Sequence, residues 1–314
     1  MSAGGCYGCF KICNWRLKMK ACINIISSRA LCLPKCLESL WKHYNHKHEY
    51  TTYVHYFDDI YDSPEFQEHI HNTISPNIKF LSIPYETPKH IREEELFYNR
   101  TNLWYARTQF PVTRKGYLHM CHFMSNYYGY PNTEFEKYDY MMSLDDESAF
   151  VKDMPYDPFE VMSERPELMG ALKVLDQTKK QPHQGNFDTR VNLWKFIQDY
   201  LKQYNVEPKS EFIQNLLADP DSDTNFHFYP VCDSYVTKLK MFETQEWKQW
   251  INAVNEYGGI YKYRWGDNDV NSLFYLVHHD HPVYDLKTVD EGYHNQGQFR
   301  SLQDYAPGVK DLRK

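Results

Sequence analysis

The chain has 314 residues, 42% of them hydrophobic, which is enough for one large α/β domain with a full core. Its formal net charge of −7 argues against a nucleic-acid binder, which would carry a basic face. Eight cysteines in so long a chain do not indicate a disulfide scaffold, and no run approaches the ~20 apolar residues of a membrane span.

The first part of the chain alternates strand and helix patterns. An apolar run with β-branched residues over 21–26 predicts a buried strand, and leucines at helical spacing predict a helix over 33–41. An alternating aromatic segment over 50–57 predicts the second strand. A helix over 64–72 and a strand over 78–83 repeat the unit. Strand, helix and strand in this order imply right-handed crossovers and a parallel sheet.

Less regular patterns follow in the second part. Helical spacing is found over 117–128, 191–203, 208–218 and 244–256, with a last helix from 266. Strands are predicted over 138–144 and 260–265, and the polar segment 172–190 is predicted to be a loop. The glycines at 258 and 259 suit a helix C-cap. We expect a single α/β domain over 20–314 with a mainly parallel central sheet flanked by helices, preceded by a tail over 1–19.

The most informative feature is the acidic end of the predicted strand 138–144. Asp145 and Glu147 are spaced i, i+2, so an extended backbone points both carboxylates to one side, with Asp146 between them. Ligands of parallel sheets bind outside the carboxyl ends of strands. A Mn²⁺ or Mg²⁺ ion that also binds a diphosphate would hold such carboxylates together. Turns and helix caps use Asp equally well, so the motif alone leaves both readings open.

Four segments together resemble a known family. Residues 117–128 read Tyr-Leu-His-Met-Cys-His-Phe-Met-Ser-Asn-Tyr-Tyr, and residues 156–159 read Tyr-Asp-Pro-Phe. Residues 258–267 read Gly-Gly-Ile-Tyr-Lys-Tyr-Arg-Trp-Gly-Asp, and residues 292–294 read Gly-Tyr-His. With the opening strand, they resemble the fungal α-1,2-mannosyltransferases, also described as glycolipid 2-α-mannosyltransferases, over about residues 21–300. The resemblance implies a GT-A fold, Mn²⁺ (or Mg²⁺), GDP-mannose as the donor, and transfer with retention to an oligosaccharide or glycoprotein acceptor.

The resemblance also implies roles for individual residues. The metal ligands would be Asp145, Glu147 and His294, since histidine is a common transition-metal ligand. Donor-binding residues would be Arg29, Tyr117, His122, Asp145 and Asp146. Acceptor-binding residues would be Arg264, Trp265 and Tyr127, with the aromatic rings as stacking faces for sugars. Asp267 would accept a hydrogen bond from the acceptor hydroxyl, although it equally suits a helix N-cap. The aromatic content of 17% suits either sugar stacking or a wide core.

Two positions depart from the family pattern. His122 replaces an Arg, and Tyr235 falls where the family has a Glu that is a candidate nucleophile, with Asp233 as the nearest carboxylate. A retaining double displacement needs a carboxylate on the far face of the sugar, and without one the acceptor would attack from the front. These departures keep two alternatives open: a non-catalytic carbohydrate- or nucleotide-sugar-binding protein, and transfer from a different donor. A phosphate-ester hydrolase has only the acidic strand end in its favour.

The resembled enzymes are anchored in the Golgi membrane. Because no apolar span or signal segment is recognisable here, the sequence predicts a soluble, cytoplasmic protein, and a virus-encoded relative would fit this description.

Overall fold

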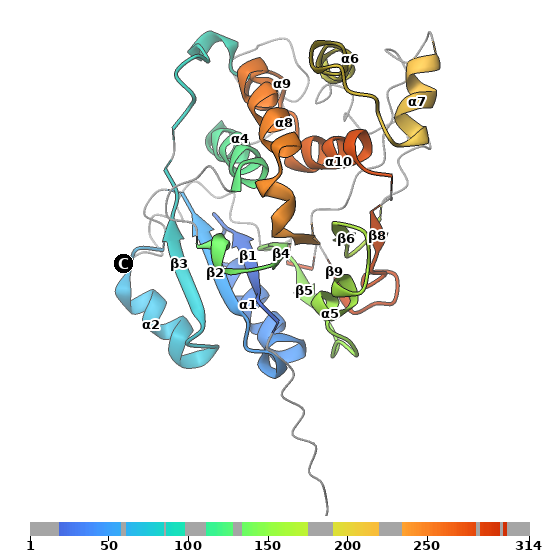
Figure 1. The fold of residues 1–314 in the computed structure, drawn as a ribbon. Coiled ribbons are helices and arrows are strands. Elements are labelled where there is room, and N and C mark those ends of the chain that lie inside the picture. Colours follow the sequence, from blue (N-terminus) through green and yellow to red (C-terminus); the bar gives the residue numbers. More distant parts are fainter. Residues whose placement is uncertain are drawn as a thin grey trace, which may run out of the picture.

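The computed structural model describes the chain over residues 19–57, 61–84, 86–97, 111–127, 134–174, 191–219, 234–280, 283–295 and 298–299. Its centre is a seven-stranded sheet of strand order β3-β2-β1-β4-β7-β6-β8 (Figure 1). Within this described part, β7 alone runs against the other strands of the sheet. The predicted α/β fold with a mainly parallel central sheet is therefore confirmed. The division into a tail over 1–19 and a domain over 20–314 stays a prediction, because residues 1–18 lie outside the described part.

The first five elements form as predicted. They are β1 (Ala21–Ile26), α1 (Cys32–His43), β2 (Thr51–Tyr56), α2 (Pro64–Thr73) and β3 (Ile78–Ser82). All six residues of β1 are buried, as expected for a parallel strand that helices cover on both faces. The start of α2 is fixed by Ser63, whose hydroxyl accepts from the Phe66 backbone N–H at 3.2 Å.

After β4 (Tyr140–Asp145), the described residues form five short strands, three of which join the sheet of β4. These are β6 (Met169–Ala171), β7 (Tyr235–Lys238) and β8 (Tyr284–Asp285) in the main sheet, and β5 (Ala149–Phe150), which pairs with β9 (His294–Asn295) in a second small sheet. Of these strands only β4 was predicted, because segments of two to four residues are too short to show a period.

Most predicted helices are present with small shifts of their ends. The longer ones are α4 (Pro111–Ser125), α6 (Leu193–Tyr204), α7 (Glu211–Ala218), α8 (Gln245–Tyr257) and α10 (Asp267–His278), and the shorter ones are α5 (Pro158–Ser163) and α9 (Gly259–Tyr263). Short 3-10 turns occupy Asn45–Lys47, Glu93–Glu95, Phe135–Lys137 and Leu239–Glu243. The strand predicted over 260–265 is wrong, because this segment forms α9. None of the helices in the described residues has the length and apolarity needed to cross a membrane.

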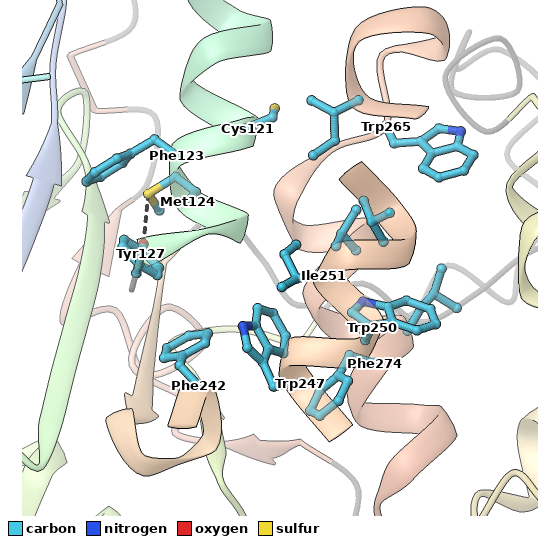
Figure 2. Packing of buried hydrophobic residues seen from close by; sticks show 14 of the residues in the cluster. Cys121, Phe123, Met124, Tyr127, Phe242, Trp247, Trp250, Ile251, Trp265 and Phe274 are labelled. Atoms are coloured by element: carbon cyan, nitrogen blue, oxygen red, sulfur yellow. Dashed lines mark hydrogen bonds between the residues drawn. The ribbon is translucent and has the colours of Figure 1, made fainter. Parts of the chain in front are cut away.

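Two hydrophobic clusters cover the two faces of the sheet. Ile23 and Ile25 of β1 pack toward α1 and α5, whereas Cys22 and Ile26 pack toward α4, α8 and α10. Figure 2 shows part of this second cluster, with Trp247, Trp250 and Phe274 between α8 and α10. The ring centroids of Trp247 and Phe274 are 4.8 Å apart in an edge-on arrangement.

The Gly-Gly segment at the end of α8 makes room for a tryptophan. Gly258 has a φ of 74° and caps α8 in the left-handed conformation. A Cβ on Gly259 would lie 2.1 Å from Cε3 of Trp265, which is fully buried. The Trp265 indole N–H donates to the Val191 carbonyl at 2.9 Å. These contacts explain why two adjacent glycines precede this helical turn.

We expect Gly259→Ala to lower the free energy of unfolding by about 1–3 kcal/mol, because the added methyl group must displace the Trp265 ring. Gly116→Ala is the matched control. A Cβ at Gly116, inside α4, meets no atom within 4 Å, so this change should stabilise the protein by about 0.5–1 kcal/mol. Urea unfolding measures the free-energy change of both variants. If the two substitutions changed the stability equally and in the same direction, the contact between position 259 and Trp265 would be contradicted.

The buried carboxylate of Asp157 connects the end of α1, the start of β2 and the start of α5. Asp157 accepts hydrogen bonds from the hydroxyls of Tyr44 at 2.8 Å and Tyr50 at 2.6 Å. It also caps α5 by accepting from the Phe159 backbone N–H at 3.0 Å, and its carboxylate lies 3.5 Å from the His48 ring nitrogen. The Tyr-Asp-Pro-Phe motif thus has a structural role.

Asp157→Asn should cost about 2–3 kcal/mol of stability, since charge-assisted hydrogen bonds to a buried carboxylate are weakened together. Asp153→Asn is the control, because the Asp153 side chain is 66% exposed and should contribute less than about 1 kcal/mol. Thermal and urea unfolding at neutral pH would show the difference. Equal losses in the two variants would rule out a special role for Asp157.

Candidate functional site

The acidic end of β4 lies beside the end of β1. The parallel register pairs Ile26 with Asp145, so the residues that follow the two strands meet at the carboxyl edge of the sheet. Asp145 is half-buried, whereas Asp146 and Glu147 are 2% and 3% exposed. Two consecutive buried carboxylates require compensation by positive charge or hydrogen bonds.

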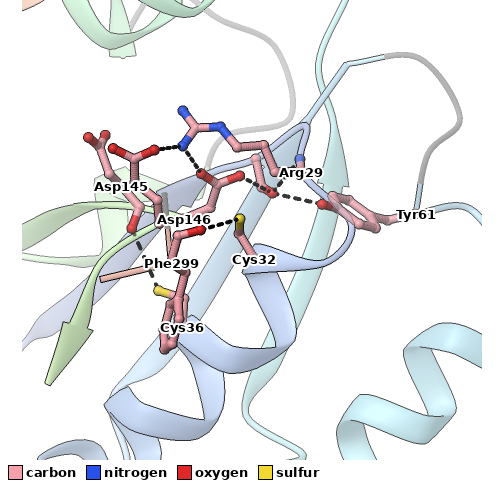
Figure 3. Close-up of polar contacts among 9 residues, drawn as sticks. Arg29, Cys32, Cys36, Tyr61, Asp145, Asp146 and Phe299 are labelled. Carbon is pink, nitrogen blue, oxygen red and sulfur yellow. Dashed lines mark hydrogen bonds and ion pairs between the residues drawn. The ribbon is translucent and has the colours of Figure 1, made fainter. Parts of the chain in front are cut away.

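Arg29, Ser27 and Tyr61 supply this compensation (Figure 3). Nη1 of Arg29 lies 3.1 Å from Oδ1 of Asp146 and also contacts the Glu147 carboxylate. The Ser27 hydroxyl donates to Oδ2 of Asp146 at 2.6 Å and lies 2.7 Å from the Tyr61 hydroxyl. The predicted donor-binding residues Arg29 and Asp146 are therefore in direct contact with each other.

Burial disfavours the charged form of Asp146, and two neighbouring groups oppose this effect. Burial raises the pKa of this carboxyl above its ordinary value, while the Arg29 guanidinium and the Ser27 hydrogen bond oppose the rise and Glu147 adds to it. The charged form of Asp146 thus depends on the adjacent cation. Bound diphosphate or metal would alter the same balance.

The C-terminal segment lies alongside this acidic strand end. β9 pairs with β5, which places His294 opposite Phe150, with their ring centroids 5.2 Å apart. The Phe299 backbone N–H donates to the Glu147 carbonyl at 3.0 Å, and the Cys32 thiol contacts the Phe299 carbonyl at 3.4 Å. Two segments that are about 150 residues apart in the sequence therefore lie next to each other at the site.

His294 carries a buried imidazole ring. It is 2% exposed, and within the described residues neither ring nitrogen has a hydrogen-bond partner. Burial lowers the pKa of His294 to about 4, so the ring is neutral at pH 7. A neutral imidazole with unpaired nitrogens is the form that ligates metal.

The predicted metal ligands fit a divalent ion only in part. Across the ranges that the structure describes, no three His, Cys, Asp or Glu side chains converge on one point, so Asp145, Glu147 and His294 do not form a preassembled trio. Glu147 is engaged by Arg29. Asp145, which is half-buried, and the neutral His294 stay predicted ligands, and hard divalent ions can bind through one or two protein ligands and complete their shell with phosphate oxygens and water.

A second group of predicted residues gathers at the start of α10. The Arg264 guanidinium lies over the Tyr117 ring, 4.1 Å from its centroid, and Arg264 itself has a φ of 63°. Asp267 is the first residue of α10 and is 7% exposed. The pKa of Tyr117 is raised by Cys121, by burial and by the charge of Asp267, and is lowered by Arg264, so these side chains share one environment. Arg264 is thus a non-glycine residue in the left-handed backbone conformation, and such residues are common in functional turns.

Three predicted aromatic residues lie in the core. Trp265, Tyr127 and Tyr235 are fully buried, and the Trp265 ring stacks on Tyr257 at a centroid distance of 5.2 Å. The expectation that Trp265 and Tyr127 offer sugar-stacking faces is therefore corrected. The hydroxyls of Tyr127 and Tyr235 are 3.4 Å apart, and burial raises the pKa of Tyr235, so it is a neutral phenol. Asp233, the predicted catalytic carboxylate, lies outside the described residues.

The remaining predicted donor residue, His122, lies apart from the strand end. Its ring packs 5.3 Å from the ring of Tyr261 in α9. Ser27 and Tyr61 were not predicted as site residues, although Ser27 lies two residues before Arg29. The hydrogen bond of Ser27 to Asp146 and the contact of Tyr61 with Ser27 appear only once the ends of β1, β2 and β4 are brought together.

The sheet, the acidic strand end and the cation beside it define a GT-A type fold, and the solved structures agree. Core-mannan synthase A of Aspergillus fumigatus, in a Mn/GDP form, matches with a TM-score of 0.67 at 18% identity, over 86% of this chain and 73% of that one. The mannosyltransferase Ktr4p of Saccharomyces cerevisiae in complex with GDP matches with a TM-score of 0.66 at 18% identity, over 92% and 80% of the two chains.

Sequence comparison identifies the family. The chain belongs to the glycolipid 2-alpha-mannosyltransferase family, whose model matches residues 10–302. The O-glycoside alpha-1,2-mannosyltransferase omh1 of Schizosaccharomyces pombe is 23% identical over 247 residues, which is 77% of this chain and 60% of the relative. Homolog 4 of the same yeast is 26% identical over 272 residues, or 76% and 60%. This chain thus spans about 60% of the length of these relatives.

Arg29→Gln should destabilise the protein more at pH 7.5 than at pH 5. The folded pKa of Asp146 is above its ordinary value, so its contribution to stability is present at low pH and lost as the pH rises through the folded pKa. Removing Arg29 removes a cause that lowers this pKa. We expect a loss of about 2–4 kcal/mol at pH 7.5 and a smaller one at pH 5, measured by urea unfolding.

Arg92→Gln is the control for this pH dependence. Arg92 is 68% exposed and pairs with Glu95, whose pKa is lowered to about 2 chiefly by that pairing, so Glu95 stays charged at both pH values. The small loss of stability in Arg92→Gln should be the same at pH 5 and at pH 7.5. A pH-independent loss in Arg29→Gln would contradict the role of the carboxylates.

Proposed function

We propose that this chain is a divalent-metal-dependent glycosyltransferase that moves mannose from GDP-mannose onto a saccharide hydroxyl and forms an α-linkage with retention. The observation that carries the proposal is the buried carboxylate pair at the end of β4, held by Arg29 at the carboxyl edge of the sheet. Membership of the mannosyltransferase family supports the sugar. The Mn/GDP form of core-mannan synthase A and the GDP complex of Ktr4p support the nucleotide and the metal.

In this proposal the strand end binds the leaving group. Asp145 and His294 would hold a Mn²⁺ or Mg²⁺ ion, which would neutralise the developing charge on the diphosphate. Arg29 is 30% exposed, so its guanidinium can reach a ligand from its place between Asp146 and Glu147. Both carboxylates contact the same nitrogen, Nη1. An arginine guanidinium has further N–H donors, which could bind a phosphate.

The acceptor would bind at the start of α10. Asp267 is the carboxylate that would accept a hydrogen bond from the attacking hydroxyl, with Tyr117 and Arg264 beside it. Tyr235 is a buried neutral phenol and is unsuited to be a nucleophile. Asp233 is then the remaining candidate for a carboxylate behind the sugar, and front-face attack by the acceptor is the alternative.

The changes at positions 122 and 235 favour a second candidate function, which is binding of a nucleotide sugar without transfer. His122 lacks the charge of the family Arg, since burial lowers its pKa to about 4. In this case GDP-mannose would bind at the same strand end and remain intact. Measured turnover separates the two functions.

The testing experiment measures nucleoside-diphosphate release from a panel of GDP- and UDP-sugars, with a saccharide acceptor, in Mn²⁺ or with chelator. We expect release from GDP-mannose that chelator abolishes. Asp145→Ala and His294→Ala should each lower kcat/KM by about 100-fold or more, because ligand loss weakens metal binding and charge stabilisation.

Asp153→Ala, which changes an exposed carboxylate at the other edge of the sheet, should leave the rate unchanged. Release from another sugar nucleotide would refute mannose as the donor sugar. GDP-mannose binding by calorimetry without turnover would select the non-catalytic function. Unchanged activity in Asp145→Ala would exclude its role as a metal ligand.

A further inference from the structure

A cleft separate from the acidic strand end lies between α4 and α8. Its walls are the segment after β3 (Pro84 and 86–89), the end of α4, and α8 with the turn before it, and its volume is about 930 Å³. This is near the upper end of the ~300–1,000 Å³ range of ligand clefts. None of the described residues that line it belongs to the contacts among Arg29, Asp146 and Glu147.

Primary amides are the most numerous kind of polar side chain in this cleft. Four of them line it, at Asn126, Gln245, Asn252 and Asn255, together with the side chains of Glu86, Thr87, Lys89, His122 and Lys248. A primary amide both donates and accepts hydrogen bonds, and so does each hydroxyl of a sugar. The chemistry of the walls therefore matches a ligand rich in hydroxyl groups.

Part of this wall is fixed in advance. Nδ2 of Asn255 donates to Oδ1 of Asn126 at 2.7 Å, and Nδ2 of Asn126 donates to the His122 carbonyl at 2.8 Å. Nε2 of His90 lies 2.8 Å from the Asn255 carbonyl, so the segment after β3 also contacts the end of α8. Because these amides are already oriented, a ligand would lose less affinity to their ordering.

The two aromatic rings beside the cleft are not open to a ligand. Phe242 and Trp247 line it but are only 1% and 2% exposed, so their ring faces are covered. The exposed large hydrophobic residues of the described ranges lie elsewhere, at Leu31, Val151, Val191 and Leu217. A peptide or an acyl chain is anchored by inserting side chains or methylene groups against open ring faces, and these two rings do not offer any.

Helix α4 contributes residues both to the cleft and to the proposed acceptor site. Tyr117, which stacks with Arg264, precedes His122 by five residues, or roughly 7.5 Å along the helix axis. We propose that the cleft binds the sugars of an acceptor glycan beyond the one that receives mannose. This inference rests on the proposed function and specifies its acceptor as an oligosaccharide chain rather than a single sugar.

The test compares linear α-linked manno-oligosaccharides of one to five sugars as acceptors. We expect the wild-type KM to fall with acceptor length, by about tenfold in total, which corresponds to one or two net hydrogen bonds. Asn252→Trp places an indole in the cleft from an exposed position of α8. In this variant the KM of the long acceptors should rise to that of the monosaccharide, with unchanged kcat and unchanged KM for GDP-mannose.

Glu256→Trp is the matched control, since Glu256 is exposed on α8 and does not line the cleft. It should keep the wild-type dependence on acceptor length. The proposal is overturned if Asn252→Trp also keeps this dependence, or if the gain with length requires a peptide or lipid attached to the glycan.

A binding measurement separates this proposal from the proposed function. Calorimetry with mannotetraose in the absence of donor should detect binding to the wild type and to Glu256→Trp, but not to Asn252→Trp. This result would support the cleft even if no transfer occurred with any acceptor. Absence of mannotetraose binding to the folded wild-type protein would overturn it.

Discussion

The arrangement of the site depends on how the fold accommodates negative charge at the end of β4. Asp146 and Glu147 are almost fully buried, and a buried carboxylate without a partner would carry a large desolvation penalty. Arg29 can pair with both only because β1 and β4 are adjacent and parallel, so that the chain leaves both strands at the same edge. The compensation of charge at the site therefore depends on the sheet topology. A change that separates these strands would disturb both.

The first strand–helix units could be predicted from sequence because their signals are local. The apolar run of β1 and the leucine spacing of α1 each fit within about twelve residues, and the parallel sheet follows from their order. Segment 260–265 was mispredicted because isoleucine, tyrosine and tryptophan favour strands. In the structure, the left-handed Gly258 and the burial of Trp265 over Gly259 impose a helical turn. Tertiary packing overrides local preference here.

The site was predictable as a set of residue types but not as a set of contacts. The acidic triplet and the late histidine could be found in the sequence, and β5–β9 pairing does bring their two segments together. That Glu147 would pair with Arg29, and that both nitrogens of His294 would lack partners among the described residues, depends on side-chain directions set by distant strands. Asp267 beside Tyr117 and Arg264 likewise requires α4 and α10 to pack together. No spacing rule encodes these contacts.

The aromatic content also has a different meaning in three dimensions. Trp250, Trp265 and Tyr127 fill the space between the sheet and its helices, so much of the aromatic surface is used for stability. Tyr117, by contrast, is an aromatic side chain that stays beside the proposed acceptor position. If the core takes most ring faces, selection among saccharides must depend on hydrogen bonds to hydroxyls. Directional hydrogen bonds discriminate between sugars that differ in one hydroxyl more sharply than stacking does, because a mismatched polar group is left unpaired.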